Sequence, residues 1–157
     1  SVVINYLNFI EQAYFVTAVK RKEINGKRIF ETGEKYYFED IGLRNAIGGF
    51  KPDDISKILE NLVYNQLCYL GYKVFVGKEG EKEIDFIAEK NGEYCYFQVT
   101  YLLSNENVIN REFGNLQLIK DNYPKYVITL DELPVKTSYK GIKQLNLLNF
   151  LCLNDLV

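Results

Sequence analysis

The clearest alternation of hydrophobic and polar positions lies in residues 83–100, EIDFIAEKNGEYCYFQVT. Aliphatic and aromatic residues flank the pair Asn91-Gly92, which suits a two-residue turn because both central positions need a positive φ. The pattern therefore predicts an antiparallel hairpin, and the turn fixes its register. In that register Asp85 lies directly opposite Gln98.

Side chains alternate between the two faces of a strand, so the register also sorts the hairpin into two faces. One face is wholly apolar and is predicted to belong to the core: Ile84, Phe86, Ala88, Cys95, Phe97 and Val99. The other face carries a compact polar group at the open end of the hairpin: Glu83, Asp85, Gln98 and Thr100. These four residues are either a functional site or a hydrogen-bonded, partly wet sheet surface.

The remaining periodicity predicts helices and strands on both sides of this hairpin. Helical spacing of apolar residues indicates helices in residues 1–15, 55–70 and 104–123, and short apolar runs indicate strands in residues 72–78 and 126–130. A last strand and a short helix end the chain. From the second helix onward the order α-β-β-β-α-β predicts an α/β fold with a mixed sheet and helices on both faces.

The helix of residues 55–70 begins after Asp53 or Asp54, either of which can cap it, and Gly71 ends it. Its buried stripe is predicted to hold Leu59, Leu62, Val63, Leu67 and Leu70. Glu60 lies beside this stripe rather than opposite it. Its carboxylate can therefore point along the sheet surface instead of into bulk water.

A second Asn-Gly pair, Asn25-Gly26, predicts a turn between two strands in residues 15–38. Five cations gather near this turn: Lys20, Arg21, Lys22, Lys27 and Arg28. A helix followed by a basic two-stranded ribbon is typical of the end of a winged helix, and such a ribbon can contact nucleic-acid phosphates. The alternative is a solvated hairpin tip.

The sequence predicts two structural regions in the chain. Residues 1–40 are expected to be the C-terminal part of a winged-helix-like segment, and residues 53–157 are expected to form the mixed-sheet domain. The segment between them contains glycines and a proline, which suits a connection. Because residue 1 opens directly into a helical pattern, we expect the chain to be part of a longer protein.

Composition narrows the possible chemistry. The chain has no histidine, which excludes a Ser-His-Asp or Cys-His triad, His-ligated zinc and a histidine general base. The three cysteines lack Cys-x-x-Cys spacing and predict neither a disulfide framework nor a structural metal. The net charge of −2 provides no global attraction for nucleic acid. No apolar run approaches the ~20 residues that cross a bilayer, so we expect no membrane partner and a cytoplasmic location.

Glu60 on the helix, Asp85 on the second strand and Gln98-Val99-Thr100 on the third resemble the restriction-endonuclease-like PD-(D/E)XK fold. The pattern of that fold has an acid on the second strand and (D/E)-x-K on the third. Gln98 therefore stands where an acid belongs, and Thr100 stands where the lysine belongs. The resemblance implies that Glu60, Asp85, Gln98 and Thr100 occupy the catalytic positions, with two of them altered.

Several stretches resemble the C-terminal region of prokaryotic AAA-type P-loop ATPases: EKYYFEDIGLRNAI, LENLVYNQL, GYKVFVGKEGEKEIDFIAEKNG and REFGNLQLIKDNYPKYVITLDE. In that family a winged helix follows the ATPase core, and a nuclease-like domain of unknown function follows the winged helix. The resemblance implies an N-terminal ATPase core as the partner, with ATP bound there. The ATP-binding motif G-x-x-x-x-G-K-[ST] is not in this sequence.

A nuclease of this fold holds Mg²⁺ with carboxylates and uses a lysine to orient the attacking water. We therefore expect weak Mg²⁺ binding by Glu60, Asp85 and Gln98, with Glu83 as a compensating ligand, and little or no cleavage. The predicted function is a non-catalytic or weakly catalytic accessory domain that serves nucleic-acid recognition or regulation. An active Mg²⁺-dependent endonuclease and a protein–protein interaction module are the alternatives.

Overall fold

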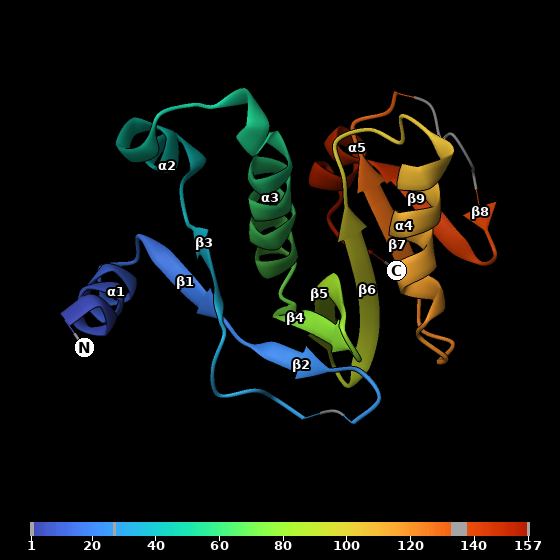
Figure 1. Cartoon of the computed structure of the whole chain (residues 1–157), viewed down its shortest axis with the longest axis horizontal. Coiled ribbons are helices and arrows are strands. Elements are labelled where there is room, and N and C mark those ends of the chain that lie inside the picture. Colours follow the sequence, from blue (N-terminus) through green and yellow to red (C-terminus); the bar gives the residue numbers. More distant parts are fainter. Residues whose placement is uncertain (1, 27, 133–137, 157) are drawn as a thin grey trace.

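The computed structural model describes residues 2–26, 28–132 and 138–156 of the chain. In these ranges the chain forms a seven-stranded mixed sheet with helices on both faces, and a two-stranded sheet lies beside it with further helices (Figure 1). The fold is α/β, as the pattern of the sequence predicts.

The large sheet has the strand order β2-β4-β5-β6-β7-β9-β8. Its strands are β2 (Arg21–Glu23), β4 (Lys73–Glu79), β5 (Lys82–Lys90), β6 (Glu93–Val99), β7 (Lys125–Thr129), β9 (Ile142–Asn146) and β8 (Ser138–Tyr139). Antiparallel pairing joins β4 to β5, β5 to β6 and β8 to β9, whereas β2–β4, β6–β7 and β7–β9 are parallel pairs. The sheet is therefore mixed, with an antiparallel meander at its centre.

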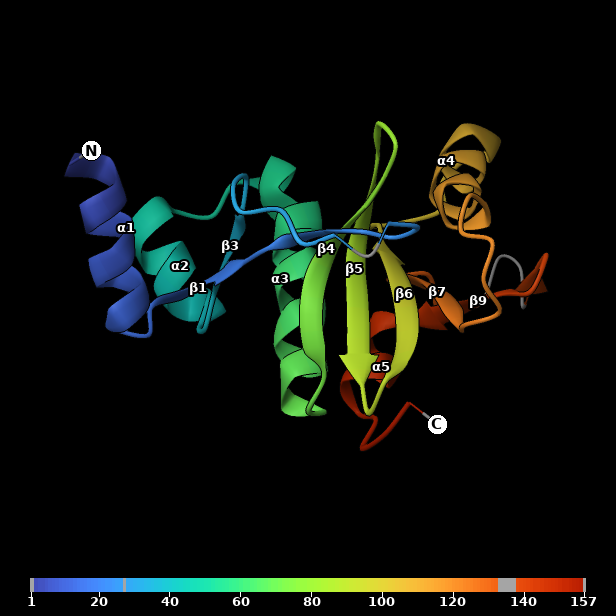
Figure 2. The same ribbon diagram turned by 90° about the horizontal axis from the view of Figure 1, so that it is seen from below.

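Helices cover both faces of this sheet (Figures 1 and 2). The helices α3 (Ile55–Tyr69) and α5 (Leu147–Leu151) pack on one face, here called the α3 side. The helix α4 (Glu106–Gln117) packs on the other, the α4 side. A separate hydrophobic core fills each side. The order α3-β4-β5-β6-α4-β7 confirms the predicted α-β-β-β-α-β arrangement.

The helix α3 follows its predicted stripe and ends where predicted. Three residues at helical spacing are buried against the sheet: Leu59, Val63 and Leu67. Gly71 follows the helix with a φ of 83°, a conformation that glycine adopts without steric cost. Asp54 occupies the N-cap position, but its carboxylate is ion-paired with Arg44 and Lys57 instead of accepting a helix N–H.

The β5–β6 hairpin has the predicted turn and register. Phe86 lies opposite Phe97, and the ladder continues in the same register to the turn. Asn91 and Gly92 both have positive φ values, of 55° and 84°. The turn chemistry therefore fixes the pairing in this part of the sheet.

The predicted division of the hairpin into a core face and a wet face is wrong in two respects. In the predicted register Ile87 and Tyr96 share the face of the polar group, but both are buried in the α4-side core. Ile84 lies in that same core, whereas Phe86, predicted to share its face, lies in the α3-side core. Both faces of this hairpin are thus buried, because a helix covers each of them.

A β-bulge between β4 and β5 causes the change of face. Phe75 pairs with Ile87 and Gly77 pairs with Ile84, so β5 spans one residue more than β4 over this stretch. An extra residue in one strand interrupts the regular alternation of side chains. The side chains of β5 that precede the bulge therefore point to the opposite side of the sheet from the side that the hairpin register predicts.

The N-terminal region has antiparallel pairing on both sides of the Asn25-Gly26 turn, as predicted, with Lys22 opposite Ile29 in an isolated bridge. The strands of this ribbon are divided between two sheets. After α1 (Val2–Gln12), β1 (Val16–Val19) pairs with β3 (Lys35–Phe38) in the small sheet. The chain changes sheets at Lys20, because β2 hydrogen-bonds to the edge of β4. The remaining helical segments of this region are α2 (Ile41–Gly48) and a 3-10 turn at Pro52–Asp54.

The large sheet extends across the predicted division between residues 1–40 and 53–157, since β2 belongs to it. Val19 and Tyr37 are also buried in the α3-side core. The assignment of residues 1–40 to the end of a winged helix remains a prediction. Within the described ranges, no helix has the length and apolar character needed to cross a membrane.

Candidate functional site

The candidate site is a group of three acidic side chains that come from two elements. Glu60 lies on α3, and Glu83 and Asp85 lie near the start of β5. Because Ile84 points to the α4 side, strand alternation turns its two neighbours toward α3. The bulge thus brings both acids of β5 to the side of the sheet that Glu60 occupies. We call these three residues the carboxylate cluster.

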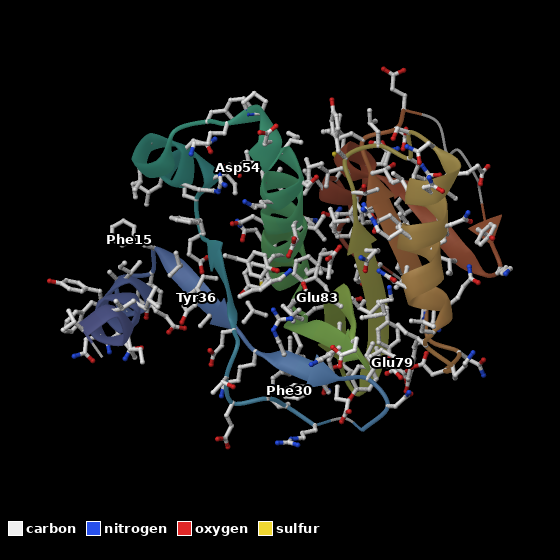
Figure 3. All side chains as sticks on the ribbon, viewed as in Figure 1. Phe15, Phe30, Tyr36, Asp54, Glu79 and Glu83 are labelled. Carbon is white, nitrogen blue, oxygen red and sulfur yellow. The ribbon has the colours of Figure 1, made fainter. Side chains whose placement is uncertain are left out.

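A lysine from the small sheet joins the carboxylate cluster. The Nζ atom of Lys35, on β3, lies 2.9 Å from Oε1 of Glu60 and 2.5 Å from Oε1 of Glu83. The hydroxyl of Tyr37 donates to the same oxygen of Glu60, and Arg21 is ion-paired with the other oxygen of Glu83. Glu83 lies between the lower end of α3 and the strands β4 and β5 in Figure 3. The chain itself therefore supplies two cations to three carboxylates.

These contacts set the protonation of the site. Burial raises the pKa of Tyr37, and the neighbouring Glu60 carboxylate raises it further, so the phenol stays protonated as a donor. Burial alone would lower the pKa of Lys35, but Glu60 and Glu83 outweigh it and raise that pKa. Burial alone would raise the pKa of Glu83, yet the hydrogen bonds from Lys35 and Arg21 lower it. Lys35 and Glu83 are thus held as an ion pair.

Asp85 lies where the β5–β6 ladder stops. Its Oδ2 accepts a hydrogen bond of 2.7 Å from the backbone N–H of Val99, and Oε1 of Gln98 accepts one of 3.2 Å from the backbone N–H of Asp85. Burial raises the pKa of Asp85, and the Glu60 carboxylate adds to the rise, while the Val99 N–H and Lys35 oppose it. Side-chain oxygens thus accept backbone N–H groups of β5 and β6 beyond the end of this ladder.

The structure divides the predicted catalytic residues. Gln98 is adjacent to Asp85, but it lies opposite Val127 of the α4-side core, and its own neighbours in sequence belong to the α3-side core. Thr100 is buried, and its backbone N–H donates to the carbonyl of Ile128 in the next strand. Strand alternation therefore places Gln98 and Thr100 on the α4 side, whereas Asp85 joins Glu60 on the α3 side. The predicted polar group does not lie on one face.

The carboxylate cluster in this arrangement does not fit a bound Mg²⁺ ion. Across the described residues, no three Asp, Glu, His or Cys side chains are placed so that they could hold a metal ion. Lys35 bridges Glu60 and Glu83, and Arg21 engages the remaining oxygen of Glu83. Because Mg²⁺ requires several oxygen ligands around it, these protein cations compete for the same ligands.

The described members of the predicted nucleic-acid-binding group do not share one exposed tip. Lys20 and Arg28 are exposed, and the guanidinium of Arg28 lies over the ring of Phe30. Arg21 is ion-paired with Glu83 in the candidate site. Lys27 lies outside the described residues.

Lys22 is buried and points into the α4 side. Its Nζ lies 3.0 Å from Oε2 of Glu89 and 3.2 Å from the hydroxyl of Tyr94, and it also lies 4.8 Å from the ring centroid of Phe75. Burial alone would lower the pKa of Lys22, but Glu89 and Tyr94 raise it. This lysine is a structural cation that fixes β2 to the sheet, so it is not available for phosphate contacts.

Lys35 and Tyr37 belong to the site but were not predicted from the sequence. They lie 25 and 23 residues from Glu60 along the chain. One signal was present: Lys35 and Tyr37 are two residues apart on a predicted strand, so they share a face. That pattern could show that they act together, but it could not show which carboxylate they meet.

Comparison with known proteins finds a bacterial relative. The chain is similar to an uncharacterized protein of Haemophilus influenzae, with 39% identity over 146 residues. The similar region covers 93% of this chain and 36% of the relative, so the chain spans about a third of that protein's length. No protein-family model matches the chain. No solved structure matches it.

Proposed function

We propose that this chain is a nuclease-like accessory domain, non-catalytic or weakly catalytic, that serves nucleic-acid recognition or regulation beside an ATPase core. The restriction-endonuclease-like interpretation is supported by the α-β-β-β-α-β order and by the acids on α3 and β5. These features are those that the sequence resemblance leads one to expect. The proposal concerns a degenerate member of that fold.

One observation carries the non-catalytic part of the proposal: the catalytic positions lie on opposite sides of the sheet. Metal-dependent hydrolysis needs carboxylates and a lysine around one reacting phosphate. Here Glu60 and Asp85 lie on the α3 side, while Thr100, at the lysine position, lies on the α4 side and carries no charge. Glu60 is already ion-paired with Lys35, and Glu83 is ion-paired with both Lys35 and Arg21.

The proposed ATPase neighbour rests on the sequence resemblance and on the length of the relative. Most of the Haemophilus influenzae protein lies outside the region that resembles this chain, which leaves room for another domain. A G-x-x-x-x-G-K-[ST] motif in that remaining part would support the proposal. Its absence from the relative would contradict the ATPase part and leave the nuclease-like part standing.

A nicking assay and a binding assay test the function. We expect the purified chain to leave supercoiled plasmid intact in Mg²⁺ or Mn²⁺, and to bind DNA or RNA with an affinity that falls as salt rises. The double variant Lys20→Gln/Arg28→Gln should weaken binding and lower the slope of log K against log [salt] by about two. Lys57→Gln, on the exposed surface of α3, is the matched control.

The assays separate the proposal from its alternatives. Robust plasmid cleavage that is lost in Glu60→Gln would show an active endonuclease. Failure to bind DNA or RNA would contradict nucleic-acid recognition. So would an affinity that does not fall as salt rises, because phosphate contacts release counterions.

A protein-interaction module is the second candidate, and the surface of α1 favours it. This helix has no buried residue, and several of its apolar side chains are exposed: Val2, Val3, Ile4, Tyr6 and Phe9. Figure 1 shows α1 at the edge of the molecule, away from the large sheet. Exposed apolar surfaces of this kind are typical of contacts with other proteins.

A further inference from the structure

A cavity of about 200 Å³ lies on the α4 side of the large sheet, on the face opposite the carboxylate cluster. Residues of β5 and β6 form its floor. Its walls are the turn after β2 and the connection between α4 and β7 (Figure 1). Because an apolar cavity of about 150 Å³ can hold benzene, this cavity has room for one small ring system.

Three tyrosines supply the aromatic surface of the cavity. Tyr94 and Tyr123 meet edge to face, with their ring centroids 5.3 Å apart. Tyr96 is buried, and its hydroxyl donates to Oδ2 of Asp121 at 2.6 Å. The other oxygen of Asp121 accepts the backbone N–H of Tyr123 at 3.1 Å and the ammonium of Lys125 at 3.0 Å. The aromatic wall is therefore fixed before a ligand binds, which lowers the entropy cost of binding.

Hydrogen-bond donors at the cavity keep unused capacity. The ammonium of Lys22 donates to Glu89 at 3.0 Å and to the hydroxyl of Tyr94 at 3.2 Å, and an ammonium has three protons. Among the described residues, none accepts the hydroxyl proton of Tyr94 or of Tyr123. A ligand with acceptor atoms on its edge can use these donors.

The charges around the cavity disfavour an ionic ligand. Lys22 is ion-paired with Glu89, and Asp121 is ion-paired with Lys125, while Glu23 adds a carboxylate to the wall. An anion would therefore meet repulsion without a free cation to offset it. A cation would meet the ammonium of Lys22, which lies 4.6 Å from the centroid of a tyrosine ring that a cationic ligand would use. A neutral ring with a polar edge suits these walls.

We propose that this cavity binds a nucleobase, as a neutral planar ring with acceptor atoms on its edge. Tyr123 is the stacking partner, because no described cation lies over its ring, and Tyr94 and Lys22 donate to the edge of the base. The base belongs to a free nucleoside or to an unpaired position of a strand, which share this chemistry. The inference goes beyond the proposed function, since the cavity includes none of the predicted catalytic positions.

Calorimetric titration with adenosine and, separately, with cytidine tests the proposal. We expect Tyr123→Ala to weaken binding by at least about fivefold, because it removes the stacking surface. Tyr94→Phe keeps the ring and removes one donor, so it should weaken binding by about threefold. Tyr69→Ala, on the exposed surface of α3, is the matched control and should bind as the unchanged chain does. Adenosine monophosphate should bind no more tightly than adenosine.

Nuclear Overhauser contacts locate the nucleoside in the unchanged chain, so the test does not depend on a variant that folds. Protons of the base should contact ring protons of Tyr94 or Tyr123. The proposal is wrong if neither nucleoside binds, if the contacts lie only outside the cavity, or if tetramethylammonium binds there in place of adenosine. A marked gain in affinity from the phosphate would also overturn it, because the cavity would then be an anion site.

A single-stranded oligonucleotide distinguishes the two sources of the base. If it displaces adenosine from the cavity, the base of a strand is the ligand. If adenosine binds and the oligonucleotide does not, a free nucleoside is the ligand. The second result would support this inference while it contradicts the nucleic-acid recognition in the proposed function.

Discussion

Asp85 is held among charges of both signs. Burial and the Glu60 carboxylate raise its pKa, and the Val99 N–H and the Lys35 ammonium oppose that rise. A carboxyl group whose pKa is raised by folding stabilises the protein in its protonated form. Its contribution is present at low pH and is lost as the pH rises through the pKa of the folded state.

We therefore expect Asp85→Asn to be more stable than the unchanged chain at pH 7.5, by roughly 1–2 kcal/mol of unfolding free energy. The amide can still accept the Val99 N–H, and it carries no charge. The advantage should shrink as the pH falls and should vanish below about pH 4, where the carboxyl of the unfolded chain is also protonated. Urea unfolding across this pH range measures it.

Asp40→Asn is the control, because Asp40 is an exposed N-cap of α2 that asparagine can replace. It should change the stability little at any pH. If Asp85→Asn is instead less stable than the unchanged chain at pH 7.5, attraction between Asp85 and Lys35 outweighs burial. In that case the acid stabilises the fold in its ionised form.

Among the elements, the β4–β5 bulge decides which side of the sheet the acids face. Gly77 pairs with Ile84 at this point, where the register of the ladder shifts. A Cβ atom added to Gly77 would lie 2.8 Å from Cβ of Ile84 and 3.1 Å from Cγ1 of Ile87. The close approach of the two strands at the bulge thus requires a residue without a side chain.

Gly77→Ala should lower the unfolding free energy by about 1–3 kcal/mol, since the added methyl group must displace buried side chains. Gly114→Ala is the matched control: nothing lies within 4 Å of its added Cβ, and it is inside α4. That change should raise the unfolding free energy by about 0.5–1 kcal/mol, the helix preference for alanine over glycine. Equal effects at both positions would contradict this account of the bulge.

In the whole molecule, the N-terminal forty residues contribute unequally to stability. The helix α1 buries no residue, whereas β2 forms an edge of the large sheet and Tyr37 and Val19 lie in the α3-side core. Lys22 on β2 and Lys35 on β3 are also ion-paired with strands of the large sheet. The predicted boundary near residues 40–53 therefore has many contacts across it.

Two truncations should have different effects on thermal unfolding. Removal of residues 1–14 should shift the melting temperature by less than about 3 °C, because that segment adds little buried surface. Removal of residues 1–40 should lower it by more than about 10 °C or prevent folding, since it deletes an edge strand and part of a core. If the shorter chain of residues 41–157 melts as the full chain does, the two predicted regions fold independently after all.

Features that depend on neighbours along the chain could be predicted from the sequence alone. The Asn91-Gly92 turn set the register of the β5–β6 hairpin, because both residues tolerate positive φ. The spacing of apolar residues identified α3 and its buried stripe, and Gly71 marked its end. These signals depend on residues that are close in sequence, so the packing of other elements does not change them. They also indicated the element order, and with it an α/β fold.

Which polar residues share a site depended instead on contacts between distant elements. The bulge moved the acids of β5 to the α3 side because β4 approaches β5 closely at Gly77, which no periodicity in β5 records. Lys35 reached Glu60 and Glu83 because β3 packs beside α3, where Asn61 bonds the backbone of Phe38. A sequence pattern assigns residues to faces within one element, whereas pairing between distant elements selects which faces meet.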